Sequence, residues 1–235
     1  MKNVVIGEYL AKDINKPVDL VGISQRLVAS VSKFGIETDI VVNFENKQKL
    51  PPLVKVTQYQ PFAHYPYQGL KWFFTRWEFA YEYLLAHREI DQAALVDIGD
   101  VEMLNYPFNE IEDNILYIGD ENNDLNTYII NDDGKPDYLA DFTQKNKYLQ
   151  LLNAGVLAGT RATLLEFLSI FMKLYTDDTV QEYLGHGDTH FGFFEMAIVN
   201  YIAYTFFDGR ICHGRKVATR FMYNEQSVKS WFKHK

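Results

Sequence analysis

The chain is poor in cysteine and in long apolar runs, and both shortages limit what kind of protein it can be. A single cysteine, Cys212, among 235 residues excludes an internal disulfide framework and favours a reducing compartment. No apolar stretch approaches the roughly 20 residues that cross a bilayer, and the first residues, MKNVVIGEYLAKD, lack the apolar region of a secretory signal. We therefore expect a cytoplasmic protein with at most peripheral membrane contact.

The sequence also lacks glycine-rich phosphate signatures and a surplus of positive charge. Neither G-x-G-x-x-G nor G-x-x-x-x-G-K-[ST] occurs, which argues against the kinases and dinucleotide enzymes that use them. The net charge of −8 argues against a nucleic-acid partner. Acidic side chains concentrate in residues 109–142, which predicts a solvated face. Basic side chains concentrate in residues 209–235, which could bind phosphates.

Short apolar runs alternate with amphipathic stretches, and this alternation predicts the fold. Runs of apolar residues predict strands at 4–6, 37–42, 53–57, 93–96, 115–118, 153–156 and 217–222. Apolar residues at helical spacing predict helices at 23–34, 70–87, 161–175 and 193–207. Residues 119–147 lack such periodicity and predict a mobile acidic flap. We expect one α/β domain over residues 1–235, with a mostly parallel central sheet and helices on both faces.

Two carboxylates directly follow the most apolar of the expected strands. Asp97 and Asp100 come after the run that ends at Val96, with Gly99 allowing a tight turn between them. Ligands of α/β sheets collect where strands end, and carboxylate oxygens are the ligands that Mg²⁺ and Mn²⁺ prefer. The pattern therefore favours a divalent-cation site, although a structural turn would explain the same two residues.

Four segments in order resemble the GT-A nucleotide-sugar glycosyltransferases of bacterial or viral glycan biosynthesis. They are RWEFAYEYL (76–84), ALVDIGDVEMLNYPF (94–108), LLNAGVLAGTRATLLEFL (151–168) and FFEMAIVNYIAY (193–204). The second is similar to the Asp-x-Asp metal region in a variant with two intervening residues, and the third to an Asn-Ala-Gly-Val segment. The resemblance implies a GT-A-like fold and the transfer of a sugar from a nucleoside-diphosphate donor, by family habit UDP-sugar, to a glycan or glycolipid hydroxyl.

The same resemblance implies a Mn²⁺ or Mg²⁺ cofactor and a set of site residues. The candidate metal ligands are Asp97, Asp100 and one of the histidines His234 and His213, and Asp100 aligns better than Asp97 with the family's metal-binding aspartate. The candidate donor-binding residues are Gly7, Tyr9, Arg76, Asn153, Ala154, Gly155 and Arg215, with Arg220 as a further phosphate partner. The candidate bases for the acceptor hydroxyl are Asp188 and Glu195.

Each of these assignments competes with a plainer one. Glu195 could be a helix-N-terminal acid that the helix dipole stabilises, and the small residues near Asn153 could simply let strands pack closely. Glu195-Met196 also stands where the family often has Asp-Gln, which leaves open a non-catalytic nucleotide-sugar or glycan-binding module. A third alternative is a Zn or Fe metallohydrolase built on His186, Asp188 and His190.

Overall fold

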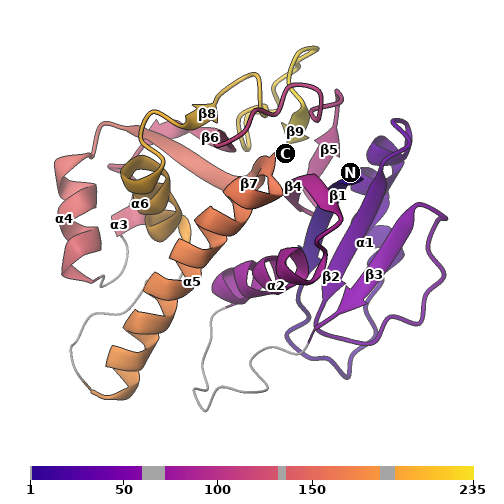
Figure 1. The fold of residues 1–235 in the computed structure, drawn as a ribbon, viewed down its shortest axis with the longest axis horizontal. Coiled ribbons are helices and arrows are strands. Elements are labelled where there is room, and N and C mark those ends of the chain that lie inside the picture. The colour runs from indigo at the N-terminus through magenta and orange to yellow at the C-terminus, as the bar shows by residue number, and fades with distance from the viewer. Residues whose placement is uncertain (1, 60–71, 132–135, 186–193) are drawn as a thin grey trace.

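A seven-stranded mixed sheet organises the chain, whose computed structural model describes residues 2–59, 72–131, 136–185 and 194–235 (Figure 1). The strand order is β3-β2-β1-β4-β7-β6-β8, and β5 and β9 form a separate two-stranded sheet. The strands are β1 (Lys2–Tyr9), β2 (Glu37–Val42), β3 (Val54–Gln58), β4 (Ile90–Asp97), β5 (Val101–Met103), β6 (Leu116–Asp124), β7 (Gln150–Thr160), β8 (Ile211–His213) and β9 (Phe232–His234). Only β7 is antiparallel to its neighbours in the large sheet, which confirms an α/β fold with a mostly parallel sheet.

Helices cover both faces of this sheet. They are α1 (Leu20–Ser32), α2 (Trp72–Ala86), α3 (Tyr128–Asn131), α4 (Asp137–Lys145), α5 (Arg161–Tyr183) and α6 (Met196–Phe206). In Figure 1, α2, α5 and α6 lie in front of the sheet and α1 lies behind it. No helix within the described ranges combines the length and the apolar character needed to cross a bilayer.

The period-two alternation of β1 explains why the sheet has a core on each side. Successive side chains of a strand point to opposite faces. Val4 and Ile6 join the core that α2, α5 and α6 cover, whereas Val5 joins the core beneath α1, and all three are fully buried. The polar side chains of β1 therefore come only near its ends, and its carboxyl end lies beside that of β4.

The prediction that residues 119–147 lack regular structure is wrong for the part of them that the structure describes, and their mobility stays a prediction. The segment begins inside the central sheet, since β6 runs on to Asp124 and pairs with β7. Leu125, Ile130 and Leu139 are at most 1% exposed and belong to the core beside α6. The sequence did not predict the burial of these apolar residues, because three buried side chains spread over 15 residues give no periodic signal.

The prediction of a late strand at 217–222 is also wrong. Val217 and Ala218 are fully buried, but they contact the second sheet through a single bridge between Ala218 and Phe232. The strands near this end are β8 and β9, each of three residues, too short for alternation to reveal them. Apolar burial at 217–218 thus comes from a loop that packs on β9.

Candidate functional site

A cavity of about 420 Å³ lies where β1 and β4 end, beside the start of α6. This is the edge of an α/β sheet at which ligands collect. Residues of both parallel strands, of the antiparallel strand β7, of α2 and of the turn before α6 line it. Seven of the candidate site residues are among them: Tyr9, Arg76, Asp97, Asn153, Ala154, Gly155 and Glu195.

Arg76 is the central cation of the cavity wall. Its Nη1 donates to Asp97 Oδ1, and its Nη2 donates to Glu195 Oε1 at 2.9 Å and to the Ala154 carbonyl at 3.5 Å. Burial opposes the charged guanidinium, but the carboxylates of Asp97 and Glu195 outweigh it and raise the pKa of Arg76. Arg76 therefore holds two candidate functional carboxylates in fixed positions.

Asp97 and Glu195 contact the same arginine, yet their pKa values shift in opposite directions. Burial favours the neutral form of Asp97, yet the charge of Arg76 prevails and lowers the pKa of Asp97 far below its usual range. Burial dominates at Glu195 instead and raises its pKa despite the contact with Arg76. Asp97 is thus the member of the pair whose charged form its surroundings favour.

His234 lies behind the cavity wall, against the lining residues Gly155 and Asp97. His234 is 1% exposed, and its Nε2 has no hydrogen-bond partner among the described residues although it lies 3.6 Å from Asp97 Oδ2. A β-carbon on Gly155 would lie 2.2 Å from His234 Cε1 and 2.7 Å from Asp97 Oδ2. Gly155 is therefore required for Asp97 and His234 to meet.

β9 delivers His234 to this position. The strand pairs with β5, and Val101 is the register partner of His234. The His234 amide donates to Thr219 Oγ1 at 2.9 Å, and the Thr219 hydroxyl donates back to the His234 carbonyl at 3.2 Å. The ring of Phe221 packs on the imidazole with centroids 4.5 Å apart. The second sheet thus acts as the scaffold for one candidate metal ligand.

Two further carboxylates of the cavity, Glu8 and Glu121, were not predicted. Burial raises the pKa of Glu8 to about 8, an effect that the charge of Arg76 opposes and that of Asp97 reinforces. Glu8 is the register partner of Asp97 on the adjacent strand, so the signal available in the sequence was a polar residue at the end of a buried strand. Glu121 belongs to the acidic run 109–142, whose composition predicted a solvated face.

Asn153 connects Glu121 to the backbone of β7. Its Nδ2 donates to Glu121 Oε1 at 2.7 Å, and its Oδ1 accepts from the Gly155 amide at 2.7 Å. Asn153 therefore has a structural function in the described chain, in addition to its place on the cavity wall.

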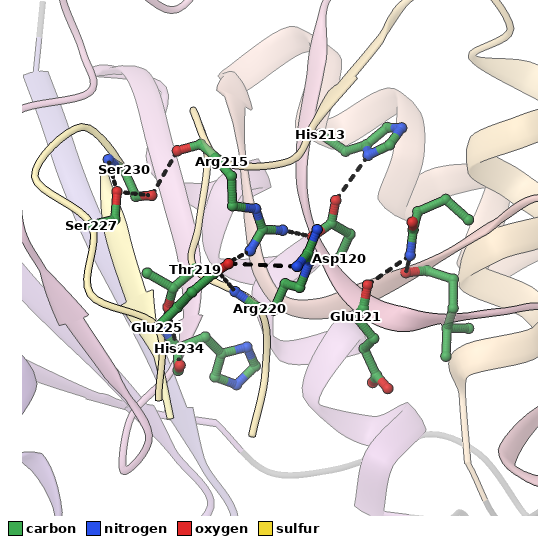
Figure 2. A network of polar contacts seen from close by, with 12 residues as sticks. Asp120, Glu121, His213, Arg215, Thr219, Arg220, Glu225, Ser227, Ser230 and His234 are labelled. Atoms are coloured by element: carbon green, nitrogen blue, oxygen red, sulfur yellow. Dashed lines mark hydrogen bonds and ion pairs between the residues drawn. The ribbon is translucent and has the colours of Figure 1, made fainter. Parts of the chain in front are cut away.

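His213 and Arg215 lie outside the cavity lining, in a separate polar network (Figure 2). His213 Nδ1 is 3.1 Å from Asp120 Oδ2, and Arg215 contacts Asp120 and, at 2.6 Å, Glu225 Oε2. Burial lowers the pKa of His213. Asp120 and Glu121 are neighbours on β6, so their side chains point to opposite faces, and only Glu121 faces the cavity.

The basic residues near this network are largely compensated by acids. Arg220 lies 3.6 Å from the Glu225 carboxylate, which Arg215 also contacts, and the Arg220 amide donates to the same carboxylate. Arg210 pairs with Glu166 through two nitrogens. Arg215 and Arg220 therefore fasten the segment that carries Phe221 and His234, and neither lines the cavity.

Two other candidate residues, Asp100 and Gly7, do not line the cavity. Asp100 Oδ1 lies 3.3 Å from Lys235 Nζ, on a half-exposed side chain. A β-carbon on Gly7 would lie 3.2 Å from Ile98 Cβ, so the absence of a side chain there serves close packing. Asp188 lies outside the described residues, as do His186 and His190 of the alternative metal site.

Two side chains of the described chain could contribute ligands to a cation that takes few of them from the protein. The described ranges hold no group of three or more His, Cys, Asp or Glu side chains arranged to bind a metal. Asp97, which is ionised and one-third exposed, and the unpartnered Nε2 of His234 are two candidate ligands side by side. Mg²⁺ sites of enzymes commonly use one or two protein ligands and complete their shell with water and substrate phosphates.

Comparison with known proteins adds no further assignment to this geometry. The chain matches no family model, and no curated protein sequence matches it.

Proposed function

We propose that the chain is a metal-dependent glycosyltransferase that moves a sugar from a nucleoside diphosphate, UDP by preference, to a hydroxyl of a glycan or glycolipid. The observation that carries the proposal is convergence. Arg76, Asp97, the segment 153–155 and Glu195 come from the four separate segments that resemble GT-A enzymes, and all of them line one cavity. These residues are spread over 120 residues of sequence, and their convergence on one cavity supports a common function.

The cation of the proposal, Mn²⁺ or Mg²⁺, would be held by Asp97 with His234 as its neighbour. When bound, it supplies a Lewis acid that neutralises the departing diphosphate. Without a cation, the diphosphate would face the carboxylates of Asp97 and Glu121 directly. We place Asp97 ahead of Asp100 because only Asp97 lines the cavity, whereas Asp100 pairs with Lys235.

The remaining residues position the reactants. Arg76 keeps Asp97 and Glu195 apart and oriented, and it is a positioning residue because its guanidinium is engaged by both. Tyr9, where β1 ends, offers a ring on which a base or sugar could stack. Glu195 is one candidate base for the acceptor hydroxyl, and Asp188, which lies outside the described residues, is the other. The proposed setting is the cytoplasm, with at most peripheral contact to a membrane that carries a lipid acceptor.

The test is a donor screen that measures binding and nucleotide release separately. Nucleoside diphosphates and their sugars are added with Mn²⁺ or Mg²⁺, and free nucleotide is measured after incubation. A glycosyltransferase should bind at least one nucleotide only with the cation and should release it slowly from its sugar donor, faster once the acceptor is supplied. Binding without any release would favour the non-catalytic module. A response to Zn²⁺ alone, lost in His186→Ala and His190→Ala, would favour the metallohydrolase.

A further inference from the structure

The cavity offers no uncommitted cation from the protein among the residues that the structure describes. Arg76 is the one lining residue of these with a cationic side chain, and Asp97 and Glu195 engage its two terminal nitrogens. Glu121, another lining residue, is a carboxylate that is 7% exposed. A negatively charged group that entered the cavity would therefore meet carboxylates without a partner of opposite sign.

Glu121 is held as a hydrogen-bond acceptor. One of its oxygens accepts from Asn153 Nδ2 at 2.7 Å, and Asn153 is itself fixed because its Oδ1 accepts from the Gly155 amide. In Figure 2 the carboxylate of Glu121 points away from the contacts that Asp120 makes with His213 and Arg215. No arginine or lysine of the described chain pairs with Glu121, so its charge is not neutralised there.

Apolar rings stand around this acceptor. Phe194 and Phe221 line the cavity, Phe194 against Phe73 with centroids 5.5 Å apart and Phe221 against His234. Rings that present apolar faces beside fixed acceptor oxygens suit a ligand that has both C–H faces and O–H or N–H donors. An uncharged sugar has both, and so does an amino sugar.

We propose that the transferred group is an uncharged or amino sugar whose O–H or N–H groups donate to Glu121, and that the cavity rejects sugars bearing a carboxylate. This inference rests on the proposed function, since it names the class of donor for that same site. The cation of the proposed site compensates the diphosphate and leaves Glu121 to face the sugar. A hexuronic acid would place its own carboxylate among Glu121 and the residues beside Arg76, where repulsion is not offset.

The test compares donors that differ only in this group. Dissociation constants are measured by calorimetry, with Mn²⁺ present, for UDP-glucose against UDP-glucuronic acid and for UDP-galactose against UDP-galacturonic acid, with UDP as reference. GDP-mannose and GDP-mannuronic acid serve if GDP is the nucleotide that binds. We expect each neutral donor to bind at least tenfold more tightly than its acid.

Variants show whether Glu121 sets the preference. Glu121→Gln keeps an acceptor for Asn153 and removes the charge, so it should narrow the ratio between the affinities of neutral and acidic donors about fivefold or more. Glu45→Gln removes one charge from an exposed side chain outside the cavity and should leave this ratio as it is. If UDP binds but the acidic donors bind as tightly as the neutral donors or more tightly, this inference is wrong and the proposed function stands. The same holds if Glu121→Gln leaves the ratio between the affinities of neutral and acidic donors unchanged. If no nucleoside diphosphate binds with either cation, the proposed function fails and the donor class fails with it.

Discussion

At the scale of single residues, the site depends on one position where no side chain fits. Gly155 lies against both His234 and Asp97, and the closest atom to its missing β-carbon is 2.2 Å away. Both neighbours are held from other directions, Asp97 by Arg76 and His234 by Thr219, so neither can move aside without losing a contact. By contrast, Gly99 lines the same cavity and a β-carbon there would meet nothing within 4 Å.

The pair Gly155→Ala and Gly99→Ala therefore forms a controlled comparison. Forcing a methyl group into a filled site costs about 1–3 kcal/mol, so Gly155→Ala should lower the melting temperature by several degrees and abolish cation-dependent nucleotide binding. Gly99→Ala should change the melting temperature by a degree or so at most. Thermal melts and calorimetry on both proteins check this. Equal behaviour of the two variants would contradict the placement of His234 beside Asp97.

At the scale of elements, an ion-pair clamp joins the three strands at one edge of the sheet. Glu37 is the first residue of β2. Its Oε1 lies 2.5 Å from Lys2 Nζ of β1 and 2.8 Å from Lys55 Nζ of β3. Burial would raise the pKa of Glu37, but hydrogen bonds from the two lysines outweigh it and lower the pKa below its ordinary value. The carboxylate consequently contributes stability above its ordinary pKa and loses it as the pH falls through the lowered one.

Glu37→Gln should reveal this contribution as a pH-dependent difference in stability. We expect the natural chain to be more stable than the variant by about 0.5–1 kcal/mol near neutral pH, since Lys55 is largely exposed and the pairs are screened. The difference should shrink as the pH is lowered below about 4.5. Urea unfolding of both proteins between pH 3 and 7 measures it. A difference that grows toward low pH would contradict the assigned clamp.

At the scale of the whole molecule, the regular part of the fold could be predicted and the irregular part could not. β2 has the bounds predicted from the run 37–42. Gly35, which has a positive φ, ends the preceding helical segment and so marks where the strand can begin. β5, β8 and β9 have three residues each, too few for any period. β6 was predicted only in its apolar first half, since the partners that allow Asp120 and Glu121 to be buried lie more than 30 residues away.

The candidate site divides in the same way. Asp97 was identified because it follows an apolar strand, and Arg76 because the resemblance places it on the helix before that strand; both line the cavity. Glu8 was missed because nothing local distinguishes it from the other polar residues at strand ends. Of the two candidate histidines, His234 lies against Asp97 and Gly155, which line the cavity, whereas His213 pairs with Asp120. That choice depends on how β9 pairs with β5, a contact 133 residues apart between Val101 and His234 that no local pattern encodes.

The most direct test of the central claim is ligand-linked stability in the natural chain, in Asp97→Asn and in Asp100→Asn. A ligand that binds only the folded protein stabilises it by about 2.7 kcal/mol at a hundredfold excess over its dissociation constant, roughly 5–10 °C for a chain of this size. The account predicts that shift with UDP plus Mn²⁺, little shift with UDP alone, its loss in Asp97→Asn and its retention in Asp100→Asn, whose side chain pairs with Lys235. An undiminished shift in Asp97→Asn, or no shift in the natural chain with any nucleoside diphosphate and either cation, would contradict it.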